Sequence, residues 1–168
     1  MTAALIPTDP DVPDFEKIVE AFLARDYTRA SKFAETLIHE AGPVQGLLLS
    51  LISLCRSGNA RRAKQLAEIS IRRLKQNDRW SAYLIRLALG QQETVSSQAS
   101  DMNRIAQCQA LFYNAAAKAS GGEKAQAIDL LKKAIVIDAP CLELYLAREE
   151  FKFLENPDNS AINPRLPS

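Results

Sequence analysis

Apolar residues recur at helical spacing along most of the chain, and no stretch of any length alternates apolar and polar residues as a strand would. The pattern therefore predicts an all-α protein of about eight helices joined by short turns. The helices are expected near residues 15–25, 26–41, 44–56, 59–74, 78–88, 105–116, 123–137 and 140–154. Residues 91–101 are rich in Gln, Ser, Glu and Thr, and they are expected to form a polar loop or a weak helix.

Residues that favour helix ends stand between these stretches. Pro43, Gly58 and the Gly121–Gly122 pair are expected to end helices, whereas Asp26 is expected to begin one and Asp138, before Pro140, the last one. The last helix is expected to bury its apolar side chains and to leave its two adjacent carboxylates in water. The apolar set is Leu142, Leu144, Tyr145 and Phe151, and the carboxylates are Glu149 and Glu150.

Length and composition indicate one soluble domain. The chain has 168 residues, of which 47% are apolar and 24% charged. We expect a flexible lead at 1–12, a single helical domain at 13–155 and a loose tail at 156–168. No apolar run approaches the roughly 18 residues that span a bilayer, and the odd number of widely spaced cysteines predicts no disulfide framework. A cytoplasmic protein without a membrane segment is expected.

Three alanines suggest that helix pairs repeat. Ala30 and Ala63 occupy the same place in their helices about 33 residues apart, and Ala127 follows after roughly two further periods. A small residue on a buried stripe lets a neighbouring helix come close, and a larger one would cost roughly 1 to 3 kcal/mol. We therefore expect all three to be buried between helices.

These motifs resemble the tetratricopeptide repeat. The second-helix pattern of that family is matched by Ala127-x3-Leu131-x2-Ala134 with Pro140 soon after, and the first-helix pattern by Leu47-x2-Ser50-Leu51-x2-Leu54 and Trp80-x2-Tyr83-Leu84-x2-Leu87. The resemblance covers most of the chain between Phe15 and Pro140. It implies a right-handed α-α superhelix of helix hairpins closed by a terminal helix.

The resemblance also implies a function, since such arrays bind peptides in a concave groove lined by the first helix of each pair. The implied role is that of an adaptor or chaperone-like module that binds an amphipathic helix of a partner protein. The alternative is that the chain's own terminal segments, or a second copy in a homodimer, cover the groove. The groove-facing residues would be Phe15, Val19, Phe22, Leu48, Ile52, Arg56, Ser81, Ile85, Phe112 and Ala116.

Catalytic or cofactor chemistry is not indicated. His39 is the only histidine and has no placed nucleophile or carboxylate partner, and the cysteines lack the spacing of a zinc site. Gly121 and Gly122 lack the neighbours of a phosphate-binding loop. The expectation is a non-enzymatic protein without catalytic residues, metal or cofactor.

Basic residues concentrate between Arg56 and Arg86, although the net charge of the chain is only +1. One interpretation is a solvated helix face, and another is a surface that binds an acidic partner or nucleic acid. Nucleic acid is disfavoured because no aromatic residue alternates with these cations for base stacking. The central residues of this basic patch are Arg61, Arg62, Arg72, Arg73 and Arg79.

Overall fold

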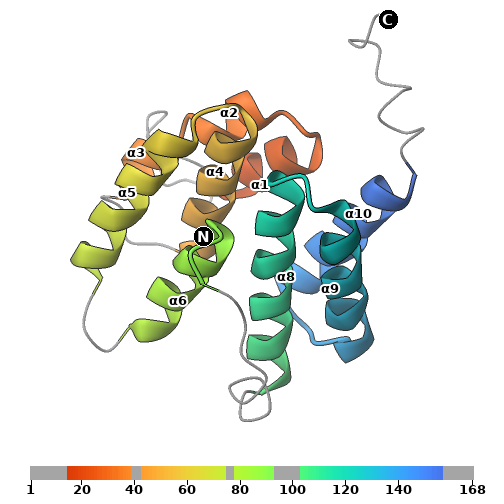
Figure 1. Cartoon of the computed structure of the whole chain (residues 1–168). Helices are drawn as coiled ribbons and strands as arrows, with labels where there is room; N and C mark the ends of the chain where they lie inside the picture. Colours follow the sequence, from red (N-terminus) through yellow and green to blue (C-terminus); the bar gives the residue numbers. More distant parts are fainter. Residues whose placement is uncertain (1–14, 39–42, 75–77, 93–102, 157–168) are drawn as a thin grey trace, which may run out of the picture. The chain divides into compact units, whose positions relative to one another are not determined.

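Helices and short turns make up residues 15–38, 43–74, 78–92 and 103–156, the part of the chain that this computed structural model describes (Figure 1). No strand occurs among these residues, so the all-α prediction is confirmed. The expected lead at 1–12 lies outside the described residues, as does the tail at 156–168 beyond Asn156. None of the described helices is both long and apolar enough to cross a membrane.

The chain divides into two compact units, residues 1–73 and 74–168. In the first unit, α4 packs against each of the other helices and is buried on nearly all sides from Gly46 to Leu54. A helix in this central place needs apolar residues on nearly all sides, and the residues of α4 meet this need. The helices of this unit are α1 (Phe15–Leu23), α2 (Tyr27–Ser31), α3 (Ala34–Leu37), α4 (Val44–Arg56) and α5 (Ala60–Arg73).

The helix expected at 26–41 is interrupted. It begins as predicted, because the carboxylate of Asp26 accepts a hydrogen bond from the backbone N–H of Arg29 at 3.2 Å. It then stops after Ser31, whose hydroxyl donates to the carbonyl of Thr28 at 2.9 Å. The chain keeps right-handed helical backbone angles at Lys32 and Phe33, but α3 resumes only at Ala34. Residues 39–42, including His39, lie outside the described part.

The second unit is built around a hairpin of two helices that lie side by side (Figure 1). The turn between α8 and α9 uses Gly122 in the left-handed region, at φ +82°, so the predicted double-glycine stop is confirmed. α10 packs against both helices of the hairpin, and α6 packs against α8. The helices are α6 (Arg79–Ala88), α8 (Arg104–Ser120), α9 (Lys124–Ile137) and α10 (Leu142–Glu155). The polar stretch at 91–101 lies outside the described residues from 93 onward.

The prediction that Asp138 begins the last helix is wrong. Asp138 ends α9 in the left-handed conformation, at φ +52°, and its N–H donates to the carbonyl of Ile135 at 3.1 Å. Aspartate tolerates this conformation better than most residues. Pro140 disfavours a helical conformation at Ala139, and α10 begins only at Leu142, after Cys141.

The alanine prediction is confirmed at all three positions. Ala30 on α2, Ala63 on α5 and Ala127 on α9 have no exposed surface. The right-handed superhelix implied by the resemblance remains a prediction.

Candidate functional site

The predicted basic patch is exposed, and most of it lies on one helix. Arg61, Arg62, Arg72 and Arg73 are all exposed on α5. The opposite face of α5 is buried through Ala63, Leu66, Ala67 and Ser70. Arg79 is also exposed, but it lies at the start of α6 in the second unit. The four arginines of α5, together with exposed Lys64, form what we call the α5 basic face.

Few acidic groups neutralise this face. Arg62 pairs with the carboxylate of Glu35 at 3.1 Å, and both side chains are largely exposed. Arg72 donates to the backbone carbonyl of Glu68 at 3.4 Å. Among the described residues, Arg61 and Arg73 make no ion pair. The α5 basic face therefore presents positive charge to the solvent.

The predicted groove residues, unlike the α5 basic face, are not exposed to solvent. Most of them are buried, namely Phe22, Leu48, Ile52, Ser81, Ile85, Phe112 and Ala116, and the other three, Phe15, Val19 and Arg56, are half-buried. A partner could reach the buried ones only if a covering part of the chain moved away. An open trough at these positions remains a prediction, and so does its alternative, a trough covered by the chain itself.

Arg56 has a structural role in the first unit. Its guanidinium carbon lies 5.5 Å from the ring centre of Phe22 and 5.2 Å from that of Tyr27, and its Nη1 donates to the Tyr27 hydroxyl at 3.0 Å. These cation–π contacts join the end of α4 to α1 and to the start of α2. The side chain is therefore held against the unit's own aromatic residues.

A buried polar cluster in the second unit was not predicted from the sequence. Glu143 has no exposed surface, and its carboxylate accepts hydrogen bonds from the Tyr113 hydroxyl at 2.8 Å and from the Gln109 amide at 3.4 Å. The Gln109 carbonyl in turn accepts from the indole N–H of Trp80 at 3.0 Å. Burial, and then the neighbouring Glu143 carboxylate, raise the pKa of Tyr113 well above its usual value, so the phenol remains a donor. The cluster ties together α6, α8 and α10.

The predicted faces of the last helix need correction. Glu150 is buried, with 2% of its surface exposed, whereas Tyr145 is 51% exposed. The buried face of α10 runs through Glu143, Leu146, Ala147 and Glu150, at the spacing of one helix stripe. The prediction that Glu150 is exposed to solvent was therefore wrong. The helix is rotated so that the side chains of Glu143 and Glu150 point inward.

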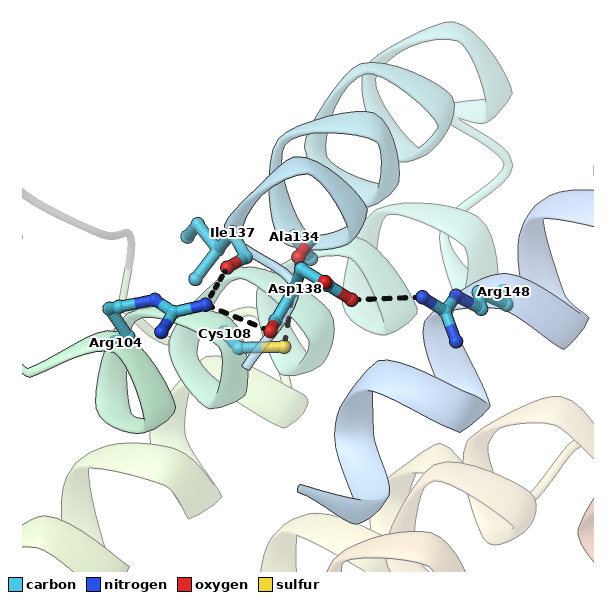
Figure 2. Close-up of polar contacts among 6 residues, drawn as sticks. All are labelled: Arg104, Cys108, Ala134, Ile137, Asp138 and Arg148. Carbon is cyan, nitrogen blue, oxygen red and sulfur yellow. Dashed lines mark hydrogen bonds and ion pairs between the residues drawn. The ribbon is translucent and has the colours of Figure 1, made fainter. Parts of the chain in front are cut away.

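Figure 2 shows how the end of α9 is held by its neighbours. Arg104 of α8 donates from Nη2 to the carbonyls of Ile137 and Asp138, at 2.7 and 2.9 Å. Arg148 of α10 pairs with the Asp138 carboxylate at 3.0 Å. A guanidinium at a helix C-terminus satisfies carbonyls that lack an intrahelical donor and opposes the negative end of the helix dipole.

The three cysteines are free thiols. Cys108 is fully buried on α8, and its Sγ lies 3.9 Å from the carbonyl oxygen of Ala134 (Figure 2). Burial, the adjacent Cys141 thiol and the Glu143 carboxylate raise the pKa of Cys108 to about 12. Cys108 is therefore a protonated thiol at neutral pH.

No group of three or more metal-ligating side chains occurs within the described ranges. Comparison of the chain with protein-family models, with curated proteins and with solved structures found no match.

Proposed function

We propose that the chain is a non-enzymatic interaction module that binds an acidic segment of a partner protein along the α5 basic face. The observation that carries the proposal is the exposure of Arg61, Arg62, Arg72 and Arg73 on one helix whose other face is buried. Glu68 is the only acidic residue of that helix. Charge complementarity therefore selects an acidic partner.

The position of the arginines supports a role in binding. Arg61 and Arg62 stand in the first turn of α5, which contains no acidic residue. A cation there opposes the positive end of the helix dipole and typically destabilises a helix by about 0.3 to 1 kcal/mol. Helix stability alone thus favours other residues at these two positions. Binding of an anionic partner gives a reason for the two arginines.

The size of the face suits a short peptide. Residues 61 and 73 lie about 18 Å apart along a helix that rises 1.5 Å per residue. An extended segment of about six residues covers that length. The Glu35–Arg62 pair is exposed, and such surface pairs contribute about 0 to 1 kcal/mol. A carboxylate of the partner can therefore replace Glu35 at little cost.

Protein is favoured over nucleic acid as the partner. No aromatic residue occurs on α5, so the face offers no platform on which bases could stack. The net charge of +1 also gives little long-range attraction to a polyanion. These features support a local match to a short acidic segment.

The scaffold for this module is proposed to be an array of helix hairpins like that of tetratricopeptide proteins. Burial of the three alanines and the α8–α9 hairpin support this proposal. An apolar groove for an amphipathic helix has less support, because its expected residues are buried or half-buried. Ile52→Asp would test the groove poorly, since a charge at a fully buried position unfolds the unit. Val19→Glu, at a half-buried position, is the milder probe.

The experiment measures binding of a fluorescently labelled peptide of alternating Glu and Ser to the full chain by fluorescence anisotropy. We expect Arg72→Gln with Arg73→Gln to weaken binding by at least about tenfold, the equivalent of about 1.4 kcal/mol. Lys132→Gln with Lys133→Gln is the matched control, because it removes the same charge from exposed positions of α9, and it should leave the affinity unchanged.

Three outcomes contradict the proposal. Equal weakening by both double variants would mean that the peptide responds only to overall charge. Tighter binding of a single-stranded oligonucleotide of the same charge, lost in the α5 variant, would assign the face to nucleic acid. Binding that persists in high salt and falls with Val19→Glu would instead support the apolar groove.

A further inference from the structure

The positive charges of the α5 basic face gather at the two ends of the helix. Arg61, Arg62 and Lys64 lie within the first five residues of α5, and Arg72 and Arg73 are its last two. All five side chains are exposed. Residues 62 and 72 lie about 15 Å apart along a helix that rises about 1.5 Å per residue. The face thus consists of an N-terminal cluster (residues 61, 62 and 64) and a C-terminal cluster (residues 72 and 73).

A carboxylate lies between the two clusters. Glu68 is exposed, seven residues after Arg61 and four before Arg72, and these spacings place the three side chains on one side of the helix. The Glu68 carboxylate takes part in no ion pair within the described part of the chain. Only the backbone carbonyl of Glu68 contacts Arg72, whose Nε donates to it at 3.4 Å. Negative charge therefore faces the solvent in the middle of the α5 basic face.

The rest of this middle stretch offers no positive charge. None of the seven residues between Lys64 and Arg72 is basic. Gln65 is exposed among them, and its side-chain oxygen accepts a hydrogen bond from Nη1 of Arg62 at 3.1 Å. A negative group of a ligand placed over this stretch would meet Glu68 and no cation, whereas one placed over either end would meet at least two cations.

We propose that the α5 basic face selects segments in which two pairs of acidic residues are separated by about three neutral residues. This inference rests on the proposed function and specifies its partner. In an extended segment that rises about 3.3 Å per residue, the inner acidic residues of such pairs lie about 13 Å apart and the outer ones about 20 Å. These distances match the separation of the two clusters. Because successive side chains point to opposite sides, a pair ensures that one carboxylate at each end faces α5.

Glu68 makes the face selective. An unbroken acidic run, or a nucleic-acid strand with its evenly spaced phosphates, places negative charge opposite Glu68. Repulsion between like charges weakens binding of such a ligand, and a binding site discriminates as much by what it repels as by what it attracts. A segment with a neutral centre avoids this repulsion and still reaches both clusters.

The test compares two fluorescently labelled peptides of the same composition, whose binding to the full chain is measured by anisotropy. The split peptide has two Glu, three Ser and two Glu in that order, and the contiguous peptide has four Glu in a row flanked by the three Ser. We expect the split peptide to bind at least about threefold more tightly, because one exposed charge contact changes an affinity by up to about fivefold.

Glu68→Gln separates the effect of the carboxylate from that of the spacing. We expect this variant to bind the contiguous peptide about two- to fivefold more tightly than the unsubstituted chain does, with little change for the split peptide. Glu155→Gln is the matched control, because it removes the same charge from an exposed position of α10, and it should keep the original preference.

The outcomes distinguish this inference from the proposed function. Equal affinities of the two peptides, both weakened by Arg72→Gln with Arg73→Gln, would overturn the selection and leave the proposed function standing. Binding of neither peptide would overturn both. A preference that survives Glu68→Gln would overturn the role of the carboxylate, and one lost equally in Glu155→Gln would show that only the net charge of the chain matters.

Discussion

At the scale of single residues, the second unit depends on a carboxylate that is kept away from water. Glu143 is fully buried, and its carboxyl oxygens accept hydrogen bonds from the Tyr113 hydroxyl and the Gln109 amide. A buried carboxylate without donors is strongly destabilising, whereas one with good donors is tolerated and holds its neighbours in place. The bond between Tyr113 and Glu143 is therefore expected to matter more than a surface bond.

Tyr113→Phe tests this expectation, since it removes the hydroxyl and keeps the ring. We expect the free energy of unfolding to fall by about 1 to 3 kcal/mol, because Glu143 keeps its burial but loses its shorter hydrogen bond. Urea denaturation followed by circular dichroism measures the change. Tyr145→Phe is the matched control, because Tyr145 is 51% exposed on α10, and its free energy of unfolding should change by less than about 0.5 kcal/mol. Equal losses in the two variants would mean that the cluster does not stabilise the unit.

Residue-scale predictions from the sequence succeeded where one helix carries the signal. The burial of Ala30, Ala63 and Ala127 follows from their place on an apolar stripe, and it is confirmed. The burial of Glu143 and Glu150 was not foreseen, because the hydrogen-bond partners of Glu143 lie about 30 residues earlier in the chain. Glu143 and Glu150 are seven residues apart, which places them on the same helix stripe as Leu146 and Ala147. This spacing was the one sequence signal that pointed to the burial of the two glutamates.

At the scale of helices, a boundary was predicted well where the residue at that boundary favours only one kind of helix end. The predicted ends of α4 match the observed ones. The helix α8 ends just before the Gly121–Gly122 pair, as expected, and Gly122 takes the left-handed conformation in the turn that follows. Asp138 failed because aspartate suits a left-handed helix end as well as a helix start, and the sequence alone does not decide between them. The ion pair between Asp138 and Arg148, on the following helix, favours the left-handed helix end.

Close approach of helices at small residues gives a prediction for α9. Ala127 is fully buried, while Ala125 of the same helix is exposed. Ala127→Leu should lower the free energy of unfolding by about 1 to 3 kcal/mol through overpacking. Ala125→Leu adds the same atoms in water and should change it by less than about 0.5 kcal/mol. Thermal melting of the two variants compares them, and a stable Ala127→Leu protein would show that the space beside α9 is not tightly filled.

At the scale of the whole molecule, length and composition suggest one domain, whereas the helices group into two compact units with a boundary in the chain between residues 73 and 74. Helical periodicity says which face of a helix is buried but not which helix covers it. The single-domain expectation therefore depends on whether the two units unfold together.

Core truncation in each unit decides this. Leu51 of α4 and Leu131 of α9 are both fully buried, so either leucine changed to alanine should cost about 2 to 5 kcal/mol. We expect Leu51→Ala to speed amide hydrogen exchange in α1 to α5 and to leave α8 to α10 as protected as before, with the reverse for Leu131→Ala, because each leucine belongs to the core of a single unit. Mass spectrometry of peptic fragments reports the two groups separately. If either variant instead raises exchange equally in both units, the helices unfold as one cooperative domain, as the chain length suggested, and the division at residue 73 has no energetic meaning.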